Sequence, residues 1–281
     1  MKKLLKLIMI EQTLFALPFA YLGTLFAGGD EIIIWLLVTV ALFSARTAGM
    51  SFNRAIDADI DSRNPRTNER LLPKGEISKK VVWIFGIISS LIFIYSSYII
   101  NELCFHLSFA ALFMLFTYSY FKRFSSTSHF YLGFIEAAAP VGGYLAVTGR
   151  FDIIPFILGA AIFFWITGLD IVYAIQDVEF DKEEGLFSIP ARFGIEKALI
   201  VSSILYFLSL AALILAGMIT NRGTTYWVAV ICVALIFFRQ QVLANGKDKK
   251  TTIAEFFQIN TFISPILFIG TFIDVMSQYW Q

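Results

Sequence analysis

Cysteine, histidine and charged residues are all scarce in this sequence. The 281 residues include two cysteines, Cys104 and Cys232, which lie far apart in apolar stretches. Their separation excludes a disulfide framework, a CxxC redox motif and a thiolate metal site. The two histidines, His106 and His129, are too few and too scattered for a zinc or haem site, which needs several convergent ligands. We interpret both histidines as interfacial residues near helix ends.

The low charge excludes an ordinary soluble domain. Only 15% of the residues are charged, whereas about a quarter are charged in a typical soluble protein. Hydrophobic residues make up 58% of the chain and aromatic residues 16%. This composition indicates an integral membrane protein. The basic start MKKLLKLIMIEQ has no small-residue cleavage site, so we interpret it as the cytoplasmic lead-in to a first span.

Long apolar runs predict membrane-spanning helices, because a helix needs roughly 20 residues to cross the hydrocarbon layer. We find nine such runs, approximately at residues 12–28, 32–50, 81–100, 103–121, 130–148, 153–169, 198–219, 224–238 and 253–273. The sixth is expected to continue through Asp170 and Tyr173 toward a charged loop. We therefore predict an all-α, polytopic membrane protein that forms one domain over residues 1–281.

The basic residues are distributed unevenly between the two sides of this arrangement. Of the 22 lysines and arginines, only Arg150 and Arg222 fall on the side opposite the others. The positive-inside rule then places the N-terminus and the loops after even-numbered spans in the cytoplasm, and the C-terminus outside, as in a bacterial-type inner membrane. The loops after spans two and six are long and acidic, so we expect the functional residues there.

These two loops carry carboxylates at helical spacing. Asn53, Asp57 and Asp61 recur every four residues, and Asp177 and Asp181 repeat that spacing four spans later, which also hints at an internal four-helix duplication. Residues four apart share a helix face, where like charges repel unless a ligand compensates them. Magnesium usually binds through one or two carboxylates plus substrate phosphates. Because both loops face the same side, the spacing predicts a magnesium and diphosphate site between them.

Other charged residues near the span ends indicate a functional role less strongly than the carboxylate pairs do. Arg66, Lys122, Arg123 and Arg192 could contact phosphate oxygens or could serve only as topology signals. We interpret Asp59, Glu179, Glu183 and Glu184 as solvated.

Two charged residues lie inside predicted spans. Arg46 belongs to span two and shares a helix face with Asn53, while Asp170 lies seven residues before Asp177. An intramembrane charge is costly unless it is paired, so each is a functional candidate. The two could also simply pair with each other.

Together these motifs resemble those of the UbiA superfamily of intramembrane aromatic prenyltransferases, over essentially the whole chain. The first segment is similar to the family motif N-x-x-x-D-x-x-x-D, although the Asn-Asp start common there is Asn53-Arg54 here. The second is similar to the D-x-x-x-D motif. The stretches TLFALPFAYLG, RTAGMSFNR, NPRT, YSYFKR and SIPARFG are similar to the branch that acts on hydroxybenzoate-type acids.

This resemblance implies nine helices around a central cavity that is capped by cytoplasmic segments. The magnesium ligands against the diphosphate of an allylic polyprenyl donor would be Asp57, Asp61, Asp177 and Asp181. The diphosphate contacts would be Asn53, Arg66, Tyr118, Lys122 and Arg192. Arg46 would meet the carboxylate of an aromatic acid, and Asp170 would orient its phenol.

The implied reaction is prenylation of a 4-hydroxybenzoate-like acid in ubiquinone biosynthesis, within the lipid bilayer and without a nucleic-acid or obligate protein partner. A naphthoate acceptor in menaquinone biosynthesis fits the NPRT stretch as well. A transporter with Arg46 and Asp170 as a coupling pair is a more distant alternative. Transporter sites often lie near mid-membrane, whereas these acids cluster at one surface.

Overall fold

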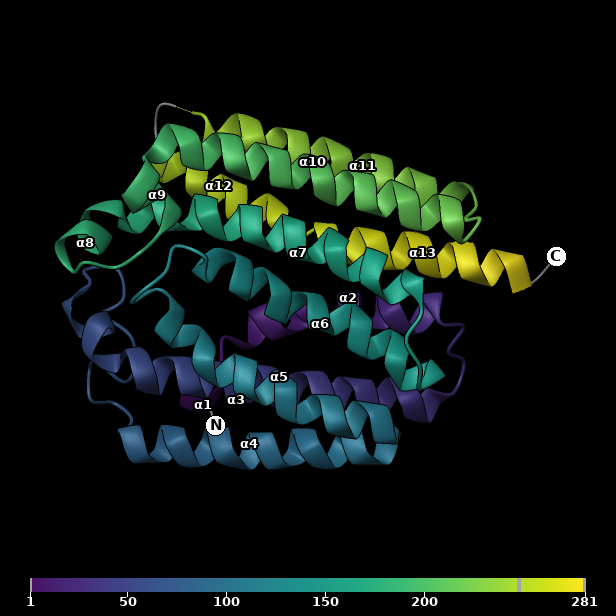
Figure 1. Cartoon of the computed structure of the whole chain (residues 1–281), viewed down its shortest axis with the longest axis horizontal. Coiled ribbons are helices and arrows are strands. Elements are labelled where there is room, and N and C mark those ends of the chain that lie inside the picture. The colour runs from purple at the N-terminus through teal and green to yellow at the C-terminus, as the bar shows by residue number, and fades with distance from the viewer. Residues whose placement is uncertain (1, 247–248, 280–281) are drawn as a thin grey trace.

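The computed structural model describes residues 2–246 and 249–279, which form helices and no strands (Figure 1). The long helices lie side by side along the long axis of the molecule, with the short helices α8 and α9 at the end opposite the C-terminus. The elements are α1 (Lys2–Leu7), α2 (Ile10–Phe26), α3 (Ile32–Arg63), α4 (Lys79–Ile100), α5 (Glu102–Phe121), α6 (Ser128–Thr148), α7 (Ile153–Ala174), the 3-10 helix η1 (Ile175–Asp177), α8 (Val178–Glu183), α9 (Ile189–Phe193), α10 (Ile195–Ile219), α11 (Thr224–Ala244), α12 (Lys249–Asn260) and α13 (Ile263–Tyr279).

Eight helical stretches of the described chain are long and apolar enough to cross a membrane. They comprise α3, α4, α5, α6, α7 with its continuation to Glu183, α10, α11, and the α12–α13 stretch. The remaining predicted span corresponds to α2, which has 17 residues and is shorter than the others. The all-helical membrane fold is therefore confirmed, and the ninth crossing stays a prediction.

Helix α3 is longer than the span predicted for it. It continues without interruption past Met50 to Arg63, so the first carboxylate pair lies on its last third. The helix stops at Asn64, whose backbone is extended, because the following Pro65 disfavours a helical conformation in the residue before it. Similarly, α7 continues to Ala174, which confirms the expected extension of the sixth span.

The last predicted span is interrupted, which corrects the expectation of one helix over residues 253–273. Helix α12 ends at Asn260 and α13 begins at Ile263. Pro265 is the third residue of α13 and has no backbone N–H to donate to the carbonyl of Thr261. Gln240 of α11 fixes the end of α12, because its amide nitrogen donates to the side-chain oxygen of Asn260 at 3.0 Å.

Helices α2 and α6 cross with their backbones in near contact. A Cβ added to Gly23 would lie 1.9 Å from the carbonyl oxygen of Pro140, and one added to Gly143 would lie 1.9 Å from that of Ala20. The hydroxyl of Thr24 donates across the crossing to the carbonyl of Gly143 at 3.3 Å. Small residues permit such close approach between membrane helices, so the two glycines determine the separation of α2 and α6.

The largest cluster of buried hydrophobic side chains includes residues of α2, α7, α10 and α11. Trp165 of α7 is buried and packs edge-on against Phe15 and Phe19 of α2. Tyr206 of α10 makes a similar contact with Phe237 of α11. By contrast, only 22% of the apolar window of α4 and 11% of that of α5 is buried inside the molecule. Their exposed apolar side chains suit contact with lipid.

Candidate active site

A polar cavity of about 180 Å³ lies between the end of α3 and the junction of α7 with α8. Its polar lining includes Asn53, Asp57, Asp61, Asn64, Arg66, Arg70, Tyr118, Lys122, His129, Asp170, Tyr173, Asp177, Asp181 and Ser188. The structure thus brings the two predicted carboxylate pairs to one cavity, together with most of the residues predicted to contact diphosphate.

The first pair is buried and surrounded by donors. Asp57 accepts hydrogen bonds from the Asn53 amide at 3.0 Å, from Lys122 Nζ at 2.7 Å and from Arg123 Nη2 at 3.2 Å. Asp61 accepts one from Arg70 Nη1 at 2.7 Å. These bonds compensate the burial of both carboxylates. Three of these donors, Asn53, Lys122 and Arg70, line the cavity, where an anionic ligand could exchange partners with them.

The second pair lies where the backbone changes from α-helix to 3-10 helix and back. Asp177 is the last residue of η1, and Asp181 belongs to α8. Arg66 donates through Nε and Nη2 to both oxygens of Asp177, at 2.9 and 2.5 Å. Its Nη1 also donates to the Tyr173 hydroxyl, and its guanidinium lies 4.7 Å from the centre of the Tyr173 ring. Arg66 therefore joins the loop after α3 to the α7–α8 junction.

Arg192 does not line the polar cavity, contrary to its predicted contact with diphosphate. It is exposed on α9, with its guanidinium 5.4 Å from the ring centre of Phe187 and 5.8 Å from that of Phe193. The physical reason is that α9 buries Ile189 and Pro190 against the bundle, which leaves the arginine outside.

The two charges inside the predicted spans do not pair with each other. Arg46 forms an ion pair with Glu136 of α6, and the two side chains are 16% and 18% exposed. Asp170 contacts Nδ1 of His129 at 2.7 Å. Each intramembrane charge is therefore compensated by its own partner.

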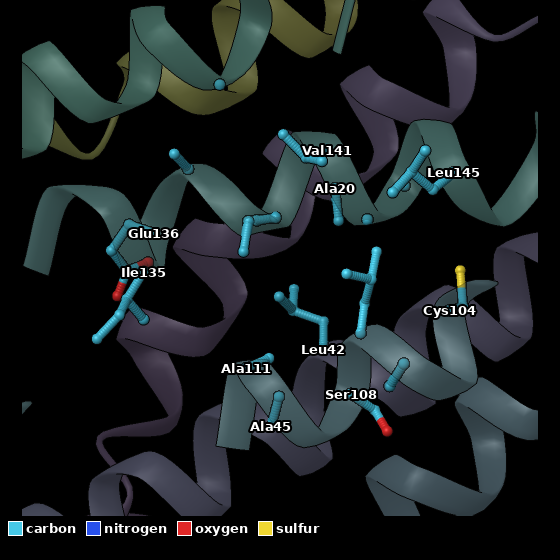
Figure 2. A pocket seen from close by; sticks show the side chains of 18 of the residues that line it. Ala20, Leu42, Ala45, Cys104, Ser108, Ala111, Ile135, Glu136, Val141 and Leu145 are labelled. Atoms are coloured by element: carbon cyan, nitrogen blue, oxygen red, sulfur yellow. The ribbon is translucent and has the colours of Figure 1, made fainter. Parts of the chain in front are cut away.

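Arg46 and Glu136 line a second, apolar cavity of about 590 Å³ (Figure 2). They are the only charged residues among the described residues that line it. Figure 2 shows Glu136 near one end of the cavity and Cys104 and Leu145 near the other. Arg46 precedes Asp57 by eleven residues on α3, which corresponds to about 16 Å along the helix axis. The apolar cavity therefore extends deeper into the bundle than the polar one.

Tyr118 of α5 lines the polar cavity, beside the two carboxylate pairs. It therefore lies where the predicted contact with diphosphate requires it.

Sequence reasoning missed three residues of these sites. Glu136 is an acid within the fifth predicted span, and the cost of an intramembrane charge would have identified it. His129 was interpreted as interfacial but is 4% exposed and hydrogen-bonded to two partners. Arg70 carried no signal beyond its positive charge, because its contact with Asp61 depends on how the loop after α3 folds.

The donor set of the polar cavity fits a hard divalent cation held jointly with a substrate. Among residues 2–246 and 249–279, no group of three or more aspartate, glutamate, histidine or cysteine side chains is close enough to hold an ion alone. Magnesium needs only one or two carboxylates when phosphate oxygens and water complete its octahedral shell. The two carboxylate pairs therefore suffice if a diphosphate lies between them.

Comparison with known proteins identifies the family. Residues 16–263 match the model of the UbiA prenyltransferase family. The chain belongs to this family. Two similar relatives are a 4-hydroxybenzoate octaprenyltransferase from Shewanella pealeana, 26% identical with 96% of this chain and 91% of the relative covered, and one from Francisella tularensis subsp. novicida, 29% identical with 86% and 84% covered.

Solved structures agree with this assignment. A UbiA homolog from Aeropyrum pernix K1 superposes with a TM-score of 0.88 at 31% identity, over 94% of this chain and 98% of that one. A UbiA homolog from Archaeoglobus fulgidus bound to GPP and Mg²⁺ shares the fold, with a TM-score of 0.71 at 21% identity, over 96% and 99% of the two chains. With its long apolar helices, this member of the UbiA prenyltransferase family is an integral membrane prenyltransferase.

Proposed function

We propose that the protein transfers a polyprenyl group from an allylic polyprenyl diphosphate to an aromatic hydroxy acid similar to 4-hydroxybenzoate, with magnesium, in quinone biosynthesis. The observation that carries the proposal is the polar cavity in which two carboxylate pairs converge with Lys122 and Arg66. The names of the relatives support the acceptor, and the Archaeoglobus fulgidus homolog bound to GPP and Mg²⁺ supports the donor and the metal.

The diphosphate of the donor occupies the polar cavity in this proposal. Asp57, Asp61, Asp177 and Asp181 hold magnesium, whose positive charge stabilises the departing diphosphate. Lys122 and Arg66 exchange their carboxylate partners for phosphate oxygens, since arginine binds them as a fork and lysine as a point charge. Asn53 and Tyr118 supply further polar contacts from the cavity wall.

The acceptor ring and the first part of the prenyl tail occupy the apolar cavity. Its lining offers no competing polar groups near the reacting carbon beyond the Arg46–Glu136 pair and a few small side chains. Arg46 contacts the acceptor carboxylate, because a guanidinium is the one cationic donor on this lining. Arg46 therefore favours an acid over a neutral phenol.

The reaction breaks the bond between the allylic carbon and the diphosphate oxygen, and the electron pair leaves with the diphosphate. A ring carbon beside the hydroxyl bonds to the allylic carbon while Asp170 accepts the phenol proton, which leaves a dienone. The ring proton then passes to the released diphosphate, and the phenol proton returns from Asp170 to restore the aromatic ring. Dry walls protect the allylic cation from water during this step.

The whole chain, residues 1–281, acts as one domain in this proposal, with the polar cavity on the cytoplasmic side and the C-terminus outside. The bias of lysine and arginine toward the polar end supports this orientation. A cytoplasmic polar cavity gives the water-soluble diphosphate headgroup direct access while the tail stays in lipid.

An acceptor screen tests the proposal. Purified protein in lipid nanodiscs with magnesium is incubated with polyprenyl diphosphates and either 4-hydroxybenzoate or 1,4-dihydroxy-2-naphthoate, and products are identified by mass spectrometry. We expect prenylated hydroxybenzoate. Product from the naphthoate alone would support the menaquinone alternative, and absence of prenylated product from both acceptors would overturn the proposed transfer to an aromatic hydroxy acid.

A further inference from the structure

His129 lies in the first turn of α6 and is held between two other parts of the chain. Its Nδ1 lies 2.7 Å from Asp170 Oδ2 on α7. The backbone N–H of Ile189, at the start of α9, donates to its Nε2 at 3.2 Å. The ring is buried, with 4% exposure, so these two contacts determine its state.

The contacts fix one tautomer of the imidazole. A backbone N–H can only donate, so Nε2 must accept and cannot carry a proton. The proton therefore resides on Nδ1, which donates to the Asp170 carboxylate. The ring is therefore neutral, and its Nδ1–H orients the Asp170 carboxylate. Many enzymes position a reactive group through such a histidine–carboxylate hydrogen bond.

One oxygen of Asp170 is thereby left for a ligand. Oδ2 accepts from His129, whereas Oδ1 accepts no hydrogen bond from residues 2–246 and 249–279. The side chain is 23% exposed and lines the polar cavity. A carboxylate with one satisfied and one free oxygen suits a single incoming O–H donor.

The same contact ties Asp170 to the segment that follows the second carboxylate pair. Ser188 precedes Ile189, caps α9 by accepting from the Ala191 N–H at 3.4 Å, and lines the polar cavity with Asp181. His129 thus sets the position of Asp170 relative to the diphosphate side of the cavity.

We infer that His129 is a positioning residue that holds Asp170 with its free oxygen toward the acceptor phenol and ties it to the Ser188–Ile189 segment. This inference rests on the proposed function and deepens it, because it assigns the phenol proton to Asp170 through a histidine that is not one of the proposed magnesium ligands. His129 acts through Asp170 rather than on the reacting atoms, because both of its ring nitrogens already have hydrogen-bond partners.

Two matched variants separate the two contacts of the ring. His129→Asn places an amide near Nδ1 and can keep the donor to Asp170, while His129→Gln places one near Nε2 and can keep only the acceptor for Ile189. We expect kcat with 4-hydroxybenzoate to fall roughly 100-fold in His129→Gln, the usual contribution of a positioned base, and markedly less in His129→Asn. KM for the diphosphate should change less than about twofold, because neither variant removes a residue that is proposed to hold magnesium or the diphosphate. His106→Gln, which alters an exposed histidine, is the control.

Acceptor acidity distinguishes positioning from a structural role. A fluorinated 4-hydroxybenzoate has a more acidic phenol and needs less help from a base, so it should recover much of the lost rate in His129→Gln and in Asp170→Asn. Equal losses in both His129 variants, unchanged by fluorination, would overturn the inference even though wild-type turnover upholds the proposed function.

A second readout does not depend on turnover. The chain has two histidines, so His106→Gln leaves one ¹⁵N-labelled imidazole. We expect its nitrogen shifts to report a neutral ring protonated at Nδ1, and a loss of that pattern in Asp170→Asn. A ring protonated at Nε2, or a charged imidazolium, would contradict the inference regardless of the activity screen.

Discussion

Arg63 and Glu184 join the two acidic segments outside the polar cavity. Arg63 Nε and Nη2 donate to the two oxygens of Glu184 at 2.8 and 2.7 Å. Arg63 is the last residue of α3, and Glu184 directly follows α8. A two-bond contact of this geometry connects the elements that carry the first and second carboxylate pairs.

Reversal of this pair tests whether it holds the cavity closed around its ligand. Arg63→Glu should raise KM for the polyprenyl diphosphate roughly two- to fivefold, the scale expected of an exposed ion pair. The double variant Arg63→Glu with Glu184→Arg should return KM most of the way to the wild-type value. Swapping Arg239 and Glu255, an exposed pair elsewhere, provides the control. If the first swap fails to restore KM, the pair has no role in substrate binding.

The same pair predicts a flat pH response. The hydrogen bond from Arg63 lowers the pKa of Glu184 below its ordinary value of 4.5. Because the pKa of Glu184 is lowered in the folded protein, the stabilisation from its ion pair with Arg63 is fully present above pH 4.5. That stabilisation is lost only as the pH falls through the lowered pKa. The KM ratio of Glu184→Gln to wild type should therefore stay constant between about pH 6 and 8. A ratio that approaches one near the acidic limit would show that Glu184 titrates there.

Turnover should require the paired aspartates and magnesium. Asp57→Asn or Asp177→Asn should lower kcat/KM roughly 100-fold or more, because each removes a carboxylate that is proposed to hold magnesium against the departing diphosphate. EDTA should abolish turnover and magnesium should restore it. Asp59→Asn changes an exposed aspartate on the same helix and is the control. Normal turnover in EDTA would remove the metal assignment.

The Arg46–Glu136 pair should affect stability and acceptor choice separately. Arg46→Leu leaves the part-buried Glu136 without its ion-pair partner inside the bundle, which should cost about 3 kcal/mol of unfolding free energy. The double variant Arg46→Leu with Glu136→Leu should recover much of that loss in thermal unfolding. Neither variant should prefer 4-hydroxybenzoate over its methyl ester. An acid preference that survives in the stable double variant would remove Arg46 from acceptor recognition.

The α2–α6 crossing should tolerate no added methyl group on its inner side. Gly143→Ala would press a methyl group against the Ala20 carbonyl and should destabilise the protein by about 1–3 kcal/mol or more. Gly142→Ala is a matched control, because a Cβ there meets nothing within 4 Å. Equal melting temperatures for the two variants would show that the helices separate freely.

Local patterns predicted the spans and the carboxylate pairs well. Apolar runs and helical spacing are properties of neighbouring residues, so Asn53, Asp57 and Asp61 were placed correctly on one helix. Pro65 and Pro265 are local signals for the end of α3 and for the break before α13. A prediction from hydropathy alone does not use these signals.

Partners distant in sequence could not be predicted in the same way. Arg46 and Glu136 lie 90 residues apart, and Arg66 and Asp177 lie 111 apart. The Arg46–Glu136 pair forms because α3 packs against α6. The Arg66–Asp177 pair forms because the loop after α3 packs against the α7–α8 junction. The outward position of Arg192 likewise follows from which side chains α9 buries, a choice that the motif SIPARFG does not encode by itself.

The walls of the apolar cavity differ in their freedom to change. On α6, backbone contact with α2 leaves no room for a larger residue at Gly143, which lines the cavity. On α3 and α5, the opposite wall includes small residues such as Ala45 and Ala111 (Figure 2). A larger residue there shortens the cavity without moving a helix. If the cavity holds the prenyl tail as proposed, single substitutions at these alanines change the length of donor it accepts while the α2–α6 crossing stays unchanged.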